Sequence, residues 1–334
     1  MFILRRYAPA VFFCVITMLC WGSWANTQKL AGADWRFELF YWDYVVGVLL
    51  MSLVFAFTLG SRGSAGRPFL DDLRQADRSA LRSALVGGVV FNLANLLLVA
   101  AIAIAGMSVA FPVGIGLALV LGVVLNYVKQ PKGNPTLLFT GVALITAAIV
   151  LCAVAYSRLP SEGESGGGTT LGLVLALLCG LLMGSFYRFV AAAMADDFVE
   201  MPAGRIGPYT AMVAFAVGVF VSNFVFNTVV MYRPPVGDPV SPAALLDGSL
   251  AQHGWGVLGG AIWAVGMTLS IIAFGVAGPA ISYGLGQGAT LVAALWGVFV
   301  WQEFAAAPTG VSTLLALMFA GYVAGLALII RSGA

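Results

Sequence analysis

Polar side chains within long apolar stretches are the first candidates for chemistry in this sequence, because each is costly to place in an apolar environment. Asn92 and Asn95 stand three positions apart, a spacing that puts both amides on one face of a helix. An amide offers donors and an acceptor, so the pair suits a solute rich in hydroxyl or ureide groups. The alternative is that the two amides hydrogen-bond a neighbouring helix.

A second group of aromatic and polar residues lies late in the chain, at Trp263, Met267, Tyr283 and Gln287. Flat rings and neutral hydrogen-bonding groups suit sugars or planar heterocycles, because a ring stacks on an aromatic side chain while its polar edge meets amides. The alternative is an aromatic belt at the membrane surface. We expect Trp263 and Gln287, which lie near the middle of apolar runs, to line a cavity.

The first apolar run ends in an abruptly polar stretch. Trp21, Trp24 and Gln28 share one helical face there. A helix that turns polar so quickly predicts a water-accessible vestibule. We therefore add these three residues to the candidate solute-binding set.

Two acidic residues in or beside apolar runs could handle charge. Asp43 stands within the second run, where an ionised carboxylate needs a partner or a proton, so it is a candidate proton carrier. The alternative pairs Asp43 with Lys29 or Arg36 at the outer surface. Glu303 stands at the end of the ninth run, where we expect it to cap or lock a helix end.

The composition indicates the solvent around these residues. Hydrophobic residues make up 61% of the 334 positions and charged residues 9%, and the mean hydropathy is +0.99. Soluble domains carry charge on about a quarter of their residues, so we expect an integral membrane protein. A bilayer core of about 30 Å requires about twenty apolar residues in a helix. Ten stretches qualify, near residues 8–25, 38–60, 84–105, 109–128, 136–156, 170–190, 209–231, 255–276, 280–302 and 310–330.

The basic residues of the connecting segments predict the orientation, because Lys and Arg stay on the cytoplasmic side. With the N-terminus inside, 12 of the 16 basic residues fall on the inner side and 4 on the outer side. The four outer residues are Lys29, Arg36, Arg158 and Arg233. We expect a multi-pass protein of the cell inner (cytoplasmic) membrane with both termini in the cytoplasm.

The chain resembles itself when it is shifted by 172 positions, which aligns Gly87-Gly88 with Gly259-Gly260. Five spans per repeat is an odd number, so the halves must cross the membrane in opposite orientations. We predict an all-α integral membrane protein of ten transmembrane helices, arranged as two inverted five-helix repeats around a central cavity. Pro112 and Pro279, near the start of the fourth and ninth spans, predict bent or broken helices there. The predicted domains are a first repeat at 1–157, an outer linker at 158–169 and a second repeat at 170–334.

Several function classes are not supported by the composition. The net charge of +2 is small and the basic residues are scattered, so no nucleic-acid partner is expected. The four cysteines have no metal-ligand spacing, and His253 is placed in an outer loop without a second ligand nearby. We expect no metal, no cofactor and no enzyme active site.

Short motifs rich in aromatic and small residues are spread along the chain. They are Tyr41-Trp42-Asp43-Tyr44, Asn95 followed by Ala105-Gly106-Met107-Ser108-Val109, Leu125-Asn126-Tyr127, and Trp296-Gly297 with Glu303. These motifs resemble the drug/metabolite transporter superfamily, and within it the glucose/ribose porter and ureide permease branch, over nearly the whole chain. The resemblance implies two inverted five-helix repeats around a cavity, and uptake of sugars or of ureides and nucleobases, often driven by protons.

The same resemblance implies roles for individual residues. It matches Asp43 and Asn95 to family positions, and it matches Asn126, Tyr127 and Glu303, to which we assign gating or structural roles. The linker lacks the lysine of a nucleotide-binding loop, so ATP use is not expected.

The predicted function is secondary transport. We expect import of a small neutral polar solute, a sugar first, by alternating access with proton symport at Asp43. The alternatives are a permease for uptake of ureides or nucleobases and an exporter of drugs or metabolites. The expected partners are the small polar solute, the lipid bilayer and protons, and the protein is expected to be a monomer or homodimer.

Overall fold

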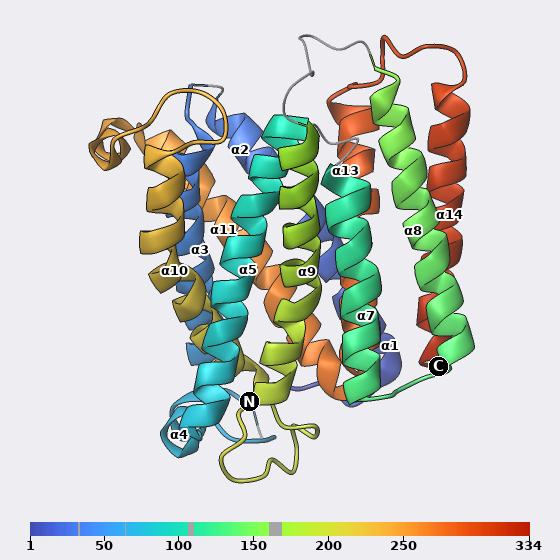
Figure 1. Ribbon diagram of the computed structural model, residues 1–334. Helices are drawn as coiled ribbons and strands as arrows, with labels where there is room; N and C mark the ends of the chain where they lie inside the picture. The colour runs from blue at the N-terminus through green and yellow to red at the C-terminus, as the bar shows by residue number, and fades with distance from the viewer. Residues whose placement is uncertain (33, 64, 106–109, 160–168) are drawn as a thin grey trace.

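The computed structural model is helical throughout the residues that it describes, which are 1–32, 34–63, 65–105, 110–159 and 169–334 (Figure 1). Within these ranges, nine helices are long and apolar enough to cross a membrane, and a shorter apolar helix covers Val113–Lys129. The all-helical class predicted from composition is therefore confirmed, and the helices are those of a multi-pass membrane protein. Most of the predicted linker lies outside the described residues.

The helices lie close to the ten predicted stretches. Their bounds are α1 Tyr7–Ser23, α2 Asn26–Ala31, α3 Phe37–Phe57, α4 Phe69–Gln75, α5 Arg78–Ala105, η1 Phe111–Gly116, α7 Leu117–Lys129, α8 Pro135–Ser157, α9 Thr169–Ala193, α10 Pro208–Tyr232, η2 Pro242–Asp247, α11 Leu250–Ala277, α12 Pro279–Gly286, α13 Ala289–Leu295, η3 Trp296–Val300 and α14 Val311–Ser332.

Local sequence explains where several helices begin. At the start of α11, Ser249 and Gln252 form a capping box, in which each side chain bonds the backbone N–H of the other residue. At the start of α8, the Asn134 side chain accepts a hydrogen bond from the Leu137 N–H. Proline, which lacks an N–H, occupies the first position of α8, α10 and α12.

The predicted ninth helix is interrupted rather than continuous. It consists of α12, α13 and η3, and Gln287 and Gly288 form the break between α12 and α13. Around this break the Gly288 N–H bonds the Leu285 carbonyl and the Thr290 N–H bonds the Gln287 carbonyl, which are i→i−3 bonds. Pro279 starts α12 instead of bending it, so the interruption lies further along the chain than the proline suggested.

The long helices pack in a defined set of neighbours (Figure 1). α5 lies against α9 and α10, α11 lies against α1 and α3, and α7 and α13 lie against α9 and α1, respectively. α8 and α14 pair at one edge of the bundle. α11 is the most buried of the long apolar helices in the described ranges, which places it at the centre.

The outer helices expose apolar side chains. On α10, for example, Val221, Phe224 and Val225 are each more than half exposed. In water such a surface would be unfavourable, but in a bilayer these side chains meet lipid tails. Several polar side chains of the spans, such as Asn92, Asn223 and Asn227, are instead buried between helices, and others lie around an internal cavity.

Candidate solute-binding site

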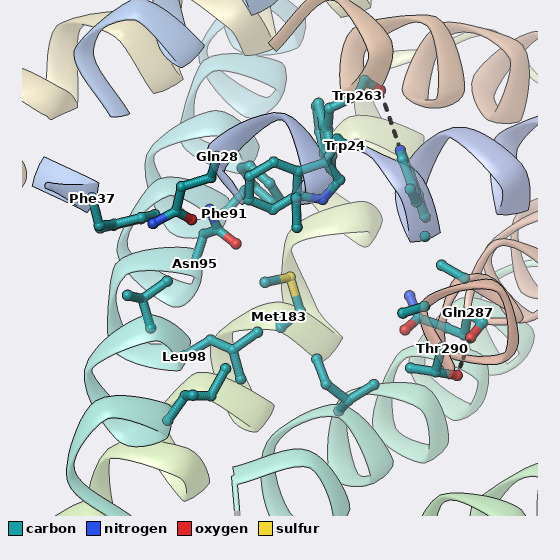
Figure 2. Close-up of a pocket in the computed structure, with 18 of the residues that line it drawn as sticks. Trp24, Gln28, Phe37, Phe91, Asn95, Leu98, Met183, Trp263, Gln287 and Thr290 are labelled. Atoms are coloured by element: carbon teal, nitrogen blue, oxygen red, sulfur yellow. Dashed lines mark hydrogen bonds between the residues drawn. The ribbon is translucent and has the colours of Figure 1, made fainter. Parts of the chain in front are cut away.

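A cavity of about 450 Å³ lies between α1, α2, α5, α9, α11 and the break after α12 (Figure 2). Small-molecule sites usually have volumes of about 300–1,000 Å³, so a solute of a few rings fits. The side chains that line the cavity are aromatic, aliphatic or neutral polar, and none of those described carries a charge.

Most of the residues expected to contact a solute come together here from distant parts of the chain. Six of them line the cavity, namely Trp21, Trp24, Gln28, Asn95, Trp263 and Gln287. Gln287 lies in the break between α12 and α13, and the turn of the chain there places its polar side chain at the cavity wall.

One wall of the cavity is aromatic. The rings of Trp21 and Trp263 are stacked, with centroids 5.8 Å apart and planes 12° apart. The Trp21 Nε1–H also donates to the Trp263 carbonyl at 3.3 Å. Phe91 lies 4.4 Å from Trp263 between ring centroids, and Phe215 stacks on the same indole at 5.7 Å. Phe91, Phe215 and Trp263 are buried against one another, so they hold Trp21, which is partly exposed and offers an apolar ring surface to a planar solute.

Neutral polar groups lie on two sides of the cavity. Figure 2 shows Gln28 and Asn95 close together on one side and Gln287 and Thr290 on the other, with Met183 between them. The Thr290 hydroxyl donates to the backbone carbonyl of Gln287 at 2.9 Å, so toward any other group its oxygen acts as an acceptor. A solute with hydrogen-bonding groups at both ends and a flat body fits this arrangement.

A vestibule of about 660 Å³ continues the cavity toward one end of the bundle. The two spaces share lining residues, including Gln28 and Phe37. The vestibule is lined by charged residues as well as aromatic ones, and Lys29 and Glu303 form an ion pair of 2.7 Å within it. The side chains thus change from charged ones at the mouth of the vestibule to uncharged ones in the cavity.

Three residues of the predicted solute-binding set are fully buried and do not line the cavity. Asn92 is enclosed between helices, where it bonds the hydroxyls of Tyr41 and Ser222 at 2.9 Å each. Tyr283 donates to backbone carbonyls of α7 and α9 at 3.2 Å. Met267 is part of the core of α11. Of the two amides on this helical face, Asn92 thus bonds neighbouring helices, whereas Asn95 lines the cavity.

Asp43 is paired with a residue that the sequence did not suggest. The Nδ1 atom of His253 lies 2.9 Å from both carboxylate oxygens of Asp43. His253 was expected in an outer loop, but it lies in the first turn of α11, which begins earlier than hydropathy indicated. Lys29 and Arg36, the surface partners considered from the sequence, each pair with a glutamate instead. Asp43 does not line the cavity.

The residues assigned to gating or structure make contacts within one helix or between different parts of the chain. The Asn126 side chain donates to the Gly122 carbonyl within α7 at 2.7 Å. Tyr127 packs edge to face with Phe139 of α8, with ring centroids 5.4 Å apart. Glu303 accepts from the hydroxyl of Tyr156 at 2.8 Å, in addition to its ion pair.

Several lining residues were missed by the sequence analysis, including Phe37, Phe91, Leu98, Met183 and Phe186. The internal repeat could have found two of them. Phe91 is the counterpart of Trp263 under the shift of 172 positions, and Phe186 ends the Gly-Ser-Phe motif that echoes Gly-Ser-Trp at Trp24. The aliphatic residues carry no such signal, because they look like any lipid-facing residue in the sequence.

Comparison with known families identifies the kind of protein that this cavity belongs to. A family model described as "Ureide permease" matches residues 40–165 and 163–332, which is most of the chain. The chain belongs to the ureide permease family. This confirms the ureide permease part of the resemblance seen in the motifs.

Individual ureide permeases are similar along nearly their whole length. Ureide permease 4 of Arabidopsis thaliana is 25% identical over 397 residues, covering 99% of each chain. Ureide permease 1 of the same plant is 22% identical, again over 99% of each chain. A probable ureide permease A3 of Vigna unguiculata is 26% identical over 71% of this chain and 80% of its own.

The fold is shared with a solved structure. A chain described as "Crystal structure of protein" superimposes with a TM-score of 0.57 over 96% of each chain, at 18% identity. The family indicates that the protein is a multi-pass membrane transporter rather than an enzyme.

Proposed function

We propose that this ureide permease family member imports a small neutral ureide or nucleobase by alternating access. The observation that carries the proposal is the uncharged cavity with an aromatic wall and polar groups on two opposite sides. A cyclic ureide has a flat ring and urea N–H and C=O groups, so it can pack against the partly exposed rings of Trp21 and Trp24 while it bonds Asn95 and Gln28. The names of the relatives point to the same class of solute.

The lining selects against charged solutes. A charge transferred into this space would lose its hydration without meeting an opposite charge on any described lining residue. A sugar is also neutral and polar, and it remains the second candidate because it can pack against the partly exposed rings of Trp21 and Trp24. The ureide ranks first because the family assignment and the amide groups agree.

Alternating access is expected of a duplicated fold, and we propose ten spans in two inverted repeats, 1–157 and 170–334, joined by the linker 158–169. Contacts at paired glycines support the duplication. A Cβ on Gly88 would lie 2.0 Å from the carbonyl oxygen of Phe215 on α10, and one on Gly260 would lie 1.9 Å from that of Tyr44 on α3. α5 therefore approaches α10 as α11 approaches α3.

Glycines on the partner helices α3 and α10 make equally close contacts with α11 and α5. A Cβ on Gly47 of α3 would lie 2.1 Å from the Val257 oxygen, and one on Gly218 of α10 would lie 2.1 Å from the Leu85 oxygen. The family match also divides near residue 164, within the linker.

We further propose that this fold belongs to the drug/metabolite transporter superfamily, which the quoted motifs support.

The orientation is proposed on two grounds. Basic residues are concentrated on the side that holds the termini in the predicted topology, at 12 against 4. Both chain ends lie at the same end of the bundle (Figure 1), as an even number of crossings requires. We place this end in the cytoplasm and the protein in the cytoplasmic membrane, so that the vestibule opens outward.

Proton coupling is proposed at the pair of Asp43 and His253. A carboxylate and an imidazole at 2.9 Å can share a proton. The pair joins α3 to α11, the helix that carries Trp263. Protonation of the pair can therefore change the packing of α11, although neither Asp43 nor His253 lines the cavity.

The experiment that tests the proposed function is solute counterflow in liposomes that contain the purified protein. Vesicles loaded with unlabelled allantoin, a small ureide, should take up labelled allantoin. They should also take up labelled uracil, at a rate no higher than that of allantoin. Parallel vesicles are tested with glucose and ribose. Asn95→Ala and Gln28→Ala should reduce ureide counterflow about tenfold, the usual effect of losing a hydrogen bond to a solute.

Asn126→Ala provides the control, because among the described residues this buried amide bonds its own helix, so its loss should change stability but not the affinity for solute. Counterflow of sugars without counterflow of ureides or nucleobases would reject the proposed solute class. Full ureide counterflow in both Asn95→Ala and Gln28→Ala would reject the proposed site.

A further inference from the structure

A continuous chain of hydrogen bonds runs from the cavity wall into the interface of α3, α5 and α10. The Asn95 Nδ2–H donates to the Tyr41 hydroxyl at 3.1 Å. The Tyr41 hydroxyl donates to Asn92 Oδ1 at 2.9 Å. The Asn92 Nδ2–H donates to the Ser222 hydroxyl at 2.9 Å, and that hydroxyl donates to the Val219 carbonyl at 3.1 Å. Asn95 is the member of this chain that lines the cavity.

The direction of every bond is fixed at the far end of the chain. The Val219 carbonyl can only accept, so Ser222 must donate to it and must accept from Asn92. Asn92 therefore turns its Oδ1 toward Tyr41, and the Tyr41 proton is committed to that oxygen. The Tyr41 oxygen can then only accept from Asn95, which must present its Nδ2 to Tyr41 and its Oδ1 away from it.

Figure 2 shows the Asn95 oxygen directed toward the cavity. The chain thus determines which end of an amide a solute meets. A solute that places an N–H group at this point gains a hydrogen bond, whereas one that places a carbonyl or an N-methyl group there does not. An asparagine whose amide could rotate freely would bind an N–H group through its oxygen or a carbonyl group through its NH₂, because the two ends of the amide differ little in shape.

We propose that Tyr41, Asn92 and Ser222 are positioning residues that orient Asn95, so that the site requires an N–H donor of the solute at this side of the cavity. This proposal rests on the proposed function and adds a rule of specificity to it. The three residues do not touch the solute, because Tyr41 and Asn92 are fully buried and Ser222 lies on α10 behind them.

The device is present in one half of the protein. Under the shift of 172 positions the counterparts of Asn92 and Asn95 are Ala264 and Met267, which offer no amide. The oriented amide is therefore present on one side of the cavity, and its requirement for an N–H group would favour one orientation of the solute. Such a fixed orientation is what discrimination between closely related rings requires.

The test compares Tyr41→Phe with Tyr44→Phe. Both tyrosines are fully buried in α3, and the rings stack on each other at 5.1 Å. The Tyr44 hydroxyl has no hydrogen-bond partner in the part of the chain that the structure describes, so its removal is a matched control. Ser222→Ala is the third variant. It removes the hydroxyl at the far end of the hydrogen-bond chain, and this residue belongs to another helix, α10.

Binding is measured by thermal shift and by competition with labelled allantoin, for uracil and for 1,3-dimethyluracil, which lacks both N–H groups. The wild type should prefer uracil over the dimethyl compound. Tyr41→Phe should bind allantoin and uracil about tenfold more weakly and should discriminate less between the two pyrimidines. Ser222→Ala should show the same change in discrimination to a smaller extent, and Tyr44→Phe should behave as the wild type.

The outcomes separate the two proposals. If the wild type binds none of the three probes, the proposed function fails. If the wild type binds and Tyr41→Phe keeps the wild-type preference for uracil, the positioning role is overturned. If Tyr41→Phe does not fold, Ser222→Ala decides in the same way, because an unchanged preference in that variant also overturns the role.

Discussion

Lys29 and Glu303 are joined across the vestibule, with Lys29 Nζ 2.7 Å from Glu303 Oε1. The bond ties α2 to the segment that follows η3, and Tyr156 of α8 adds a hydrogen bond to the same carboxylate at 2.8 Å. Lys29 also lies 4.7 Å from the ring of Trp301. Three separate parts of the chain thus meet at one carboxylate beside the path of the solute.

Glu303→Gln should shift the protein away from the conformation in which this mouth is open. Glutamine keeps an oxygen for Tyr156 but loses the charge that attracts Lys29. Because the pair is partly exposed, the free energy of unfolding should change by less than about 1 kcal/mol. The apparent affinity for allantoin added on the vestibule side should fall by a few-fold, since fewer molecules are ready to bind. Binding measured in sided vesicles checks this.

A matched control for the charge is Arg233→Gln. Arg233 is exposed at the same end of the bundle and forms no ion pair with another described residue. Lys29→Gln should reproduce the effect of Glu303→Gln, and the double variant should add little to either. Additive effects of the two substitutions would show that the ion pair does not hold the mouth open.

Gly260→Ala should destabilise the protein because two helix backbones touch at this position. The added Cβ would lie 1.9 Å from the Tyr44 carbonyl oxygen, which cannot move without moving α3. Overpacking of this kind costs about 1–3 kcal/mol. Gly254→Ala on the same helix is the control, because nothing lies within 4 Å of its Cβ. Thermal unfolding in detergent should show a lower midpoint for Gly260→Ala and an equal or higher one for Gly254→Ala.

Asp43→Asn should uncouple uptake from the proton gradient. One pH unit is worth about 1.4 kcal/mol, so one proton per solute can drive about tenfold accumulation of solute in the wild type. The variant should equilibrate allantoin without accumulating it. Its affinity for allantoin should not change, because Asp43 does not line the cavity.

The control for Asp43→Asn is Asp238→Asn, an exposed acid at the same end of the bundle. His253→Gln should behave as Asp43→Asn, since it removes the other half of the pair. Uptake measured with and without an imposed pH gradient compares the three variants. Accumulation by Asp43→Asn equal to that of the wild type would exclude the proton role.

Much of the fold could be predicted because membrane helices follow from length and hydropathy. The stretch predicted near 136–156 matches α8 at Pro135–Ser157, for example, because a polar cap and a proline mark its start. The interruption at Gln287 could not be located in this way. Gly286 and Gly288 flank it, but glycines are also frequent in uninterrupted membrane helices, so composition does not distinguish the two cases.

The site was predicted in part for a similar reason. Asn92 and Asn95 share a helical face, yet one lines the cavity and the other lies between helices, since a turn of helix is enough to separate them. The partnership of Asp43 with His253 links residues 210 positions apart, and no local pattern encodes such a contact. Spacing along one helix therefore identified the polar residues, whereas the packing of several helices decided their roles.

Tyr283→Phe should reduce stability and leave solute binding intact. Its hydroxyl donates to the carbonyls of Ala118 and Met183, and its ring lies against Gly122, so it joins α12 to α7 and α9. Removing the hydroxyl leaves these carbonyls without that donor and should cost about 1 kcal/mol of the free energy of unfolding. Because the residue is fully buried away from the cavity lining, the affinity for allantoin should stay the same. Unfolding and competition binding on one preparation distinguish the two effects, and a several-fold weaker affinity at unchanged stability would return Tyr283 to the solute-binding set.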